Sequence, residues 1–257
     1  MCSRSHFAGL TEKDELARVA AAVLRHLHNL KAKDIVSILG SLSKARYRNF
    51  QLFSALVERL EKLTPLPLNE ARSVLSFCCR IHFTNTLLVK RCAEVISANL
   101  DTLRPSDVCD VLHSLTKLRH CDATLVNSLV SKGIETLGTL DDLALVNFAT
   151  GCAKATVKAE TVAVVCQELQ SRAGVIGPLE ALRSLLVLAR FQSHPNAKPA
   201  ATSIVKRLNC SRLSLLQLTL ALEAVLSLGC EGVERVQEAL ETKRDAYPRV
   251  PPEVSYS

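Results

Sequence analysis

Five basic residues recur along this sequence at intervals that would place one positive charge on each unit of a repeating structure. The intervals are 36, 37, 37 and 36 residues, and the residues are Lys44, Arg80, Lys117, Lys154 and Arg190. We call them the cation row. A cation presented once per repeat is suited to a polyanion, because Lys and Arg neutralise phosphates and release their counterions. The spacing therefore predicts contacts with a polyanionic partner.

Positive charge is concentrated in the first half of the chain. The net charge is +7, of which residues 1–130 contribute +6 and residues 131–257 only +1. Arg46, Arg48 and Arg119 lie close to row members and are further candidates for phosphate contact. An anionic partner is thus expected to bind the N-terminal half.

A second set of residues lies seven positions before each row member. Small polar groups there could hydrogen-bond the edges of bases, as in repeat proteins that read one base per unit. The candidates are Ser37, Ser73, Asp110, Asn147 and Arg183. A solvated polar face is the alternative interpretation. The cation row has an alternative as well, because Lys or Arg in the last turn of a helix interacts favourably with the helix dipole.

The segments that must position these residues have the apolar pattern of helical hairpins. In the clearest unit, Val108, Val111, Leu112 and Leu115 fall at i, i+3, i+4 and i+7, and a second amphipathic stretch begins at Leu125. Such hairpins cannot bury their apolar faces alone, so neighbouring pairs must stack. The sequence predicts an all-α fold, an α-solenoid of tandem helical hairpins with a 36–37 residue period.

The expected array has about six units and an N-terminal half-repeat formed by one amphipathic helix over residues 12–28. We expect a single α-solenoid domain over residues 1–257, with repeats over 12–240 and irregular tails over 1–11 and 241–257. The sixth unit, over residues 211–240, is degenerate, with Leu226 where a cation is expected.

Composition and motifs favour a binding protein. The ten cysteines form no CxxC pair and several occupy apolar helical positions, which predicts buried, reduced thiols. Cys109, His113, His120 and Cys121 lack a recognised zinc spacing. No apolar run is long enough to cross a bilayer, and no targeting peptide is visible. We expect no catalytic residues, metal, cofactor, small-molecule substrate or membrane association, and hence no enzymatic activity.

The repeat units resemble those of heptatricopeptide and octotricopeptide proteins, the helical-hairpin arrays of organelles that often carry a RAP domain. The resemblance covers residues 12–240 and rests on the period and on the segments SILGSLSKARYRN, HSLTKLRHCDATLV and FATGCAKATVKAETV. A 37-residue period is closer to the heptatricopeptide type. Only 17 residues follow Leu240, too few for a RAP domain, so RNA cleavage is not expected.

The resemblance implies an RNA-binding protein of mitochondria. The expected function is that of a peripheral subunit of a mitochondrial ribosome, which contacts ribosomal RNA and neighbouring ribosomal or organellar proteins. A protein-binding α-solenoid scaffold and a factor for the stability or processing of organellar RNA are the alternatives.

Overall fold

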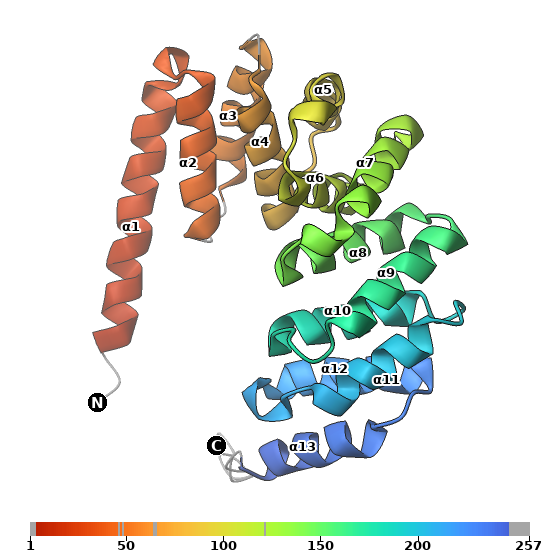
Figure 1. Ribbon diagram of the computed structural model, residues 1–257. Coiled ribbons are helices and arrows are strands. Elements are labelled where there is room, and N and C mark those ends of the chain that lie inside the picture. The colour runs from red at the N-terminus through yellow and green to blue at the C-terminus, as the bar shows by residue number, and fades with distance from the viewer. Residues whose placement is uncertain (1–3, 46, 48, 64–65, 121, 247–257) are drawn as a thin grey trace. The chain divides into compact units, whose positions relative to one another are not determined.

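The protein is all-helical and is built from consecutive helical hairpins. A computed structural model describes residues 4–45, 47, 49–63, 66–120 and 122–246, with side chains from Asp14 onward. These residues form thirteen α-helices joined by turns and short 3-10 helices, without a strand (Figure 1). The helices are α1 (Arg4–Arg25), α2 (Ala32–Lys44), α3 (Phe50–Lys62), α4 (Leu68–Ile81), α5 (Thr86–Ala98), α6 (Pro105–Lys117), α7 (Ala123–Glu135), α8 (Asp142–Ala155), α9 (Ala159–Ser171), α10 (Pro178–Arg190), α11 (Ala197–Arg207), α12 (Leu215–Leu228) and α13 (Val233–Ala246).

The helices alternate between two kinds. The even-numbered helices α2 to α12 begin the hairpins and are called A helices here, and the odd-numbered helices α3 to α13 end them and are called B helices. A helices pack on neighbouring A helices, as α2 does on α4 and α10 does on both α8 and α12. B helices do the same, since α9 packs on α11, and α1 packs on α3 as a B helix without a partner. The predicted α-solenoid, with six hairpins and a half-repeat, is confirmed.

The chain divides into two compact units, which are described separately. Unit 1 comprises Met1–Arg104 and Ser114–Asn127, and unit 2 comprises Pro105–His113 and Ser128–Ser257. In unit 1 the A helices α2 and α4 are in contact, and in unit 2 α8, α10 and α12 follow one another in a stack (Figure 1). The single domain over residues 1–257 stays a prediction.

Local capping signals explain where the first three B helices, α3, α5 and α7, begin. The Asn49 side chain accepts a hydrogen bond from the Leu52 amide (3.0 Å), and Asn85 accepts one from Leu88 (2.9 Å). Asp122 does the same for α7, with the Leu125 amide at 3.1 Å. Asn and Asp are preferred at this position because their side chains satisfy an otherwise unpaired amide. The caps recur at 36 and 37 residues, so the repeat governs helix starts as well as core positions.

The turn after four of the six A helices, α4, α6, α8 and α12, also recurs. His82, Arg119, Thr156 and Gly229 all have left-handed backbones, with φ between 54° and 58°. In the first three hairpins of this group, the left-handed residue lies two positions after a member of the cation row. Two positions before Gly229 lies Ser227, so Ser227 and not Leu226 occupies the row position of the sixth hairpin. Both residues are uncharged.

Helix extends into both of the expected tails. Helix α1 begins at Arg4 instead of near residue 12, and α13 continues to Ala246, beyond residue 240. The sixth hairpin is complete, despite its weak sequence pattern. Lys243 accounts for the C-terminal extension, because its ammonium group donates hydrogen bonds to the carbonyl oxygens of Ser211, at 3.0 Å, and Leu213. These carbonyls lie in the connection between α11 and α12, so the contacts attach the last turns of α13 to that connection.

Candidate nucleic-acid interface

One face of each A helix is left uncovered by its own hairpin and carries the sequence-predicted residues. This face follows positions i, i+4, i+7 and i+11, which share one side of a helix. We call it the A-helix stripe. Its members are Lys33, Ser37, Gly40 and Lys44 on α2; Asn69, Ser73, Ser76 and Arg80 on α4; Ser106, Asp110, His113 and Lys117 on α6; Leu143, Asn147, Thr150 and Lys154 on α8; Leu179, Arg183, Leu186 and Arg190 on α10; and Leu216, Leu220, Glu223 and Ser227 on α12.

The cation row forms the C-terminal end of this stripe. Lys44, Lys117 and Arg190 are the last residues of α2, α6 and α10, and Arg80 and Lys154 are the penultimate residues of α4 and α8. Lys44, Arg80 and Arg190 are exposed, whereas Lys117 and Lys154 are half-buried. This placement fits both interpretations of the row, because a cation in the last turn is favoured by the helix dipole and can also face a phosphate.

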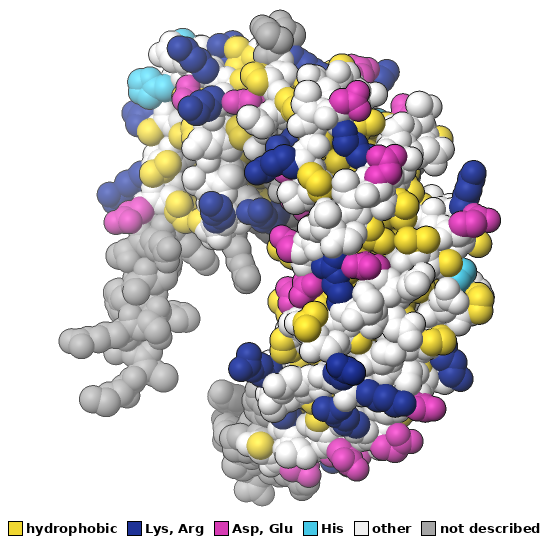
Figure 2. Space-filling view, viewed as in Figure 1, with side chains coloured by type: hydrophobic (Ala, Val, Ile, Leu, Met, Phe, Trp, Pro, Cys, Tyr) yellow, Lys and Arg dark blue, Asp and Glu magenta, His cyan; other side chains and the backbone are white. Residues whose placement is uncertain are grey.

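Of the three additional arginines proposed for phosphate contact, one can be placed in the structure. Arg119 is exposed and has a left-handed backbone at φ 58°, two residues after Lys117. Arg46 and Arg48 lie outside the described residues. On the face visible in Figure 2, the described Lys and Arg side chains are spread over many elements and are interspersed with Asp and Glu. The distinguishing feature of the row is therefore its regular position, and not a dense patch of charge.

Three of the candidate base-contacting residues hydrogen-bond to one another in unit 2. The Asn147 Nδ2 donates to Asp110 Oδ1 at 2.9 Å, and Arg183 Nη2 donates to Asn147 Oδ1 at 2.8 Å. These bonds link α6, α8 and α10. A base would have to compete with them for the Asn147 amide. In unit 1 the equivalent residues, Ser37 and Ser73, are exposed. Base contact stays a prediction for all five residues.

A second class of cations, which the sequence analysis did not single out, reaches from a B helix or its C-cap to backbone carbonyls that precede it in the array. Arg91 on α5 donates to the carbonyl oxygens of Glu61 (2.7 Å) and Leu63 (2.5 Å), at the end of α3. Arg172 donates to Leu140 O (2.5 Å) and forms ion pairs with Glu168 (2.6 Å) and Asp142 (3.5 Å). Arg235 on α13 donates to the Lys206 and Leu208 carbonyls in the same way. These arginines satisfy helix ends and thereby hold the stack together.

Three exposed leucines were also missed by the sequence analysis. Leu143, Leu179 and Leu216 are the second residues of α8, α10 and α12, and all three are exposed. We call them the leucine row. Their spacing of 36 and 37 residues repeats that of the cation row. The signal was therefore present in the sequence, but residue type alone does not distinguish an exposed leucine from a core leucine.

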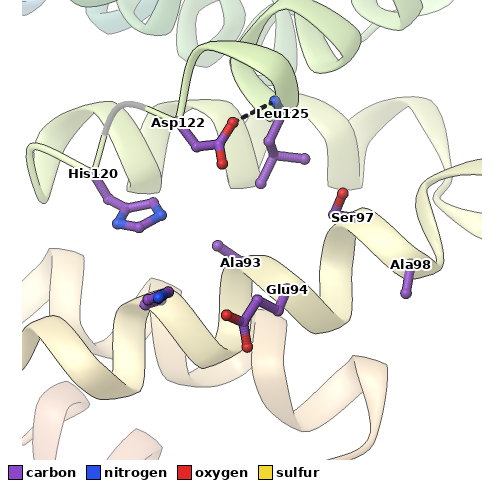
Figure 3. A pocket seen from close by; sticks show the side chains of 8 residues that line it. Ala93, Glu94, Ser97, Ala98, His120, Asp122 and Leu125 are labelled. Atoms are coloured by element: carbon purple, nitrogen blue, oxygen red, sulfur yellow. Dashed lines mark hydrogen bonds between the residues drawn. The ribbon is translucent and has the colours of Figure 1, made fainter.

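A hollow in unit 1 lies on the B-helix side. It has a volume of about 430 Å³ and is lined by α5 and by residues before and within α7. Figure 3 shows His120, Asp122 and Leu125 facing Ala93 and Ser97 across it. Lys90, Glu94 and Asp122 give its lining mixed charge. Such a lining does not favour a polyanion, so the hollow is a weaker candidate than the stripe.

The cysteines are part of the core. Eight of them are buried and free in the structure, as the sequence predicts, while Cys2 and Cys121 lie outside the described residues. Burial raises the pKa of Cys78, Cys92, Cys109 and Cys152 to about 12 and that of Cys166 to about 11. These thiols are therefore protonated at neutral pH.

Within the described residues, no group of three or more His, Cys, Asp and Glu side chains is placed to hold a metal ion. None of the described helices is both long enough and apolar enough to cross a membrane.

Comparison with known families adds one finding. Residues 11–146, which are more than half of the chain, match the family whose description is RNA-editing substrate-binding complex 6 protein. The match covers unit 1 from residue 11 together with α6, α7 and the first residues of α8, and thus includes three members of the cation row, Lys44, Arg80 and Lys117. No curated protein matches the sequence.

Proposed function

The chain belongs to the family of RNA-editing substrate-binding complex 6 proteins, and from this membership we propose that it is an RNA-binding helical scaffold within a multi-protein complex. The observation that carries the proposal is the exposed end of the A-helix stripe in unit 1. There Lys44 and Arg80 project from the last turns of two packed helices. The family's description names an RNA-editing substrate, which is the kind of polyanion that this edge suits.

The physical role would be to neutralise phosphates at regular intervals. Packed helices lie ~8–10 Å apart, so successive row members match a phosphate every one or two nucleotides of an extended strand. Contacts of this kind determine position and supply salt-dependent affinity without reading sequence. Base-specific contacts by Ser37 and Ser73 would be secondary. We propose a role in binding and positioning RNA that includes no chemical step.

Two narrower statements extend this proposal. The first is that the chain acts in mitochondria, and it rests on the likeness of its repeats to heptatricopeptide arrays. The second is that it is a peripheral subunit of a mitochondrial ribosome, bound to ribosomal RNA. The family's description instead favours an RNA-processing complex. Sedimentation of the native protein with ribosomal particles, or separately from them, distinguishes the two placements.

The test of RNA binding compares two double variants of unit 1 with the same change in charge. One is Lys44→Glu with Arg80→Glu on the A-helix stripe, and the other is Lys62→Glu with Lys90→Glu on exposed B-helix positions. The probe is a fluorescent single-stranded RNA of about 20 nucleotides. The stripe variant should bind at least about tenfold more weakly, and its log–log salt dependence should become shallower by about 1.4, or 0.7 per lost contact.

The control variant should retain the slope of the wild-type protein and an affinity within about threefold. Circular dichroism establishes that both variants are folded. Equal losses of affinity in the two variants would show that only net charge matters, and the stripe would then not be the RNA site.

A further inference from the structure

The leucine row is a feature of unit 2 that RNA binding does not explain. Leu143, Leu179 and Leu216 have exposed fractions of 50%, 47% and 69%. Each is the second residue of its helix, and α10 packs on both α8 and α12. The three side chains therefore come from equivalent positions on three successive, contacting helices.

The hairpin does not need leucine at this position. The core contacts of the same helices are made by their neighbours Leu145, Leu182 and Leu218, which are almost completely buried. In unit 1 the equivalent residues of α2 and α4 are Lys33 and Asn69, and both are exposed. A single exposed leucine is ordinary, whereas apolar side chains aligned across adjacent elements are typical of an interaction surface.

The spacing of the row matches that of an α-helix laid across it. Neighbouring packed helices are ~8–10 Å apart, so the row repeats at about that distance. A helix rises ~1.5 Å per residue, and seven residues therefore advance ~10.5 Å. An amphipathic helix with one apolar side chain per heptad would meet one leucine in each hairpin. RNA is a poorer occupant, because bases stack on aromatic side chains and phosphates need donors or cations.

The charged residues beside the leucine row determine which edge of a bound helix should carry acidic side chains. On one side, one turn further along α10, lies Arg183, and the exposed Arg190 is two turns beyond it. On the other side lie the helix starts, with Asp141 at the N-cap of α8 and Glu180 in the first turn of α10. On α12 the same side carries the exposed Glu223, two turns beyond Leu216. A carboxylate on the partner is therefore favoured beside the arginines of α10 and disfavoured at the starts of α8 and α10.

We propose that the leucine row docks an amphipathic α-helix of a partner protein, whose apolar residues recur every seven positions and whose edge toward Arg183 and Arg190 carries Glu or Asp. This proposal concerns unit 2 and does not depend on RNA binding by unit 1. It assigns protein recognition and RNA recognition to different hairpins of one solenoid.

The test uses a synthetic helical peptide of about 24 residues, with Leu at the first and fourth positions of each heptad and Glu along one edge. Binding to the full chain is measured by fluorescence polarisation. The row variant carries Leu143→Asn, Leu179→Asn and Leu216→Asn. The control variant carries Leu87→Asn, Val164→Asn and Leu226→Asn, which change three exposed apolar residues away from the row.

The proposal predicts that the wild-type protein binds this peptide, that the row variant binds at least about 30-fold more weakly, and that the control variant stays within about threefold. A peptide with Lys in place of Glu, and one of the same composition in scrambled order, should bind at least about tenfold more weakly than the first.

Four results would overturn the proposal. They are absence of binding to the wild-type protein, equal losses in the row and control variants, equally tight binding of the Lys peptide, and loss of RNA affinity in the row variant. Analytical ultracentrifugation adds a further outcome. If the wild-type protein is a dimer and the row variant a monomer, a second copy of this chain occupies the row in place of another protein.

Discussion

The A-helix stripe differs between the two units although the helices beneath it are built alike. In unit 1 the stripe on α2 and α4 carries Lys, Ser, Asn and Arg, with Gly40 as its one residue lacking a side chain. In unit 2 the stripe on α10 and α12 includes Leu179, Leu186, Leu216 and Leu220. The same repeat thus presents a polar, basic edge in one unit and a substantially apolar edge in the other.

This contrast shows which positions the fold constrains. Buried positions such as Leu39, Leu75, Leu145 and Leu185 are apolar in both units because stacking requires them. Stripe positions meet no such requirement, so their residue types report what each unit contacts. A solenoid separates these two roles cleanly, because every repeat contributes one copy of each position.

The prediction with the largest expected effect tests whether the two units differ only in their surface residues or also in their cores. Each thiol with a raised pKa keeps its proton in the folded protein, while the unfolded chain loses it above pH 9. The unfolded state then binds fewer protons, so stability is present below pH 9 and falls as the pH rises toward 12. The free energy of unfolding should fall by roughly 1 kcal/mol per pH unit for each such thiol, measured by urea titration between pH 8 and 10.5.

Two matched variants separate the units in this experiment. Cys78→Ala with Cys92→Ala removes two thiols of unit 1, and Cys109→Ala with Cys152→Ala removes two of unit 2. Above pH 9, the free energy of unfolding should fall less steeply with pH in both variants than in the wild-type protein. The reduction in steepness should be the same for the two variants, whatever their stability at pH 7. A reduction in only one of them would show that the cores differ as well as the surfaces.

The second prediction distinguishes structural cations from those of the cation row. Arg91→Ala in unit 1 and Arg172→Ala in unit 2 should each lower the free energy of unfolding by about 2–3 kcal/mol, because several partners lose their hydrogen bonds or ion pairs at once. Arg80→Ala and Arg190→Ala, at exposed helix ends, should change it by less than about 1 kcal/mol. Chemical denaturation measures all four, and a large loss in either row variant would indicate a structural role for the row.

Much of the fold was predictable because the repeat encodes it redundantly. The period, the apolar stripes and the B-helix caps such as Asn85 all specify the same hairpins. The ends were less predictable, because the charged segment from Glu241 to Arg244 lacks an apolar stripe. Its helix is held by contacts such as that of Lys243 with the connection between α11 and α12, which no local pattern contains.

The site was predictable only where residue type and position coincide. A cation at the end of an A helix is conspicuous in a sequence, and the cation row was found in this way. Leu143 stands in the run LALVNFA beside the core residue Leu145, and no composition rule separates the two. Arg91 and Arg172 were missed because they reach the preceding repeat and do not recur at one fixed position.

The third prediction compares two glycines, one in each unit, whose positions in the repeat differ by one residue. A Cβ added to Gly151 on α8 would lie 2.7 Å from Leu112 Cγ and 3.3 Å from the backbone nitrogen of His113 on α6, whereas one added to Gly40 on α2 would meet nothing within 4 Å. Gly151→Ala should therefore destabilise the protein by about 2 kcal/mol through overpacking. Gly40→Ala should stabilise it by about 0.5–1 kcal/mol through helix propensity. Urea unfolding gives both values, and destabilisation by Gly40→Ala would mean that the unit 1 stripe is covered.

The smallest expected effects concern the left-handed residues that follow the row. Thr156 in unit 2 and His82 in unit 1 have φ values of 54° and 56°. This conformation is more costly for a β-branched residue than for histidine and is not costly for glycine. Thr156→Gly should raise the free energy of unfolding by about 1 kcal/mol and His82→Gly by about half as much, as measured by thermal or urea denaturation. Gly229→Ala, at the equivalent turn of the sixth hairpin, is the converse control and should lower it by about 1 kcal/mol. Destabilisation by Thr156→Gly would mean that the threonine side chain makes a contact that outweighs its backbone strain, and the turn of unit 2 would then differ from that of unit 1 in more than residue type.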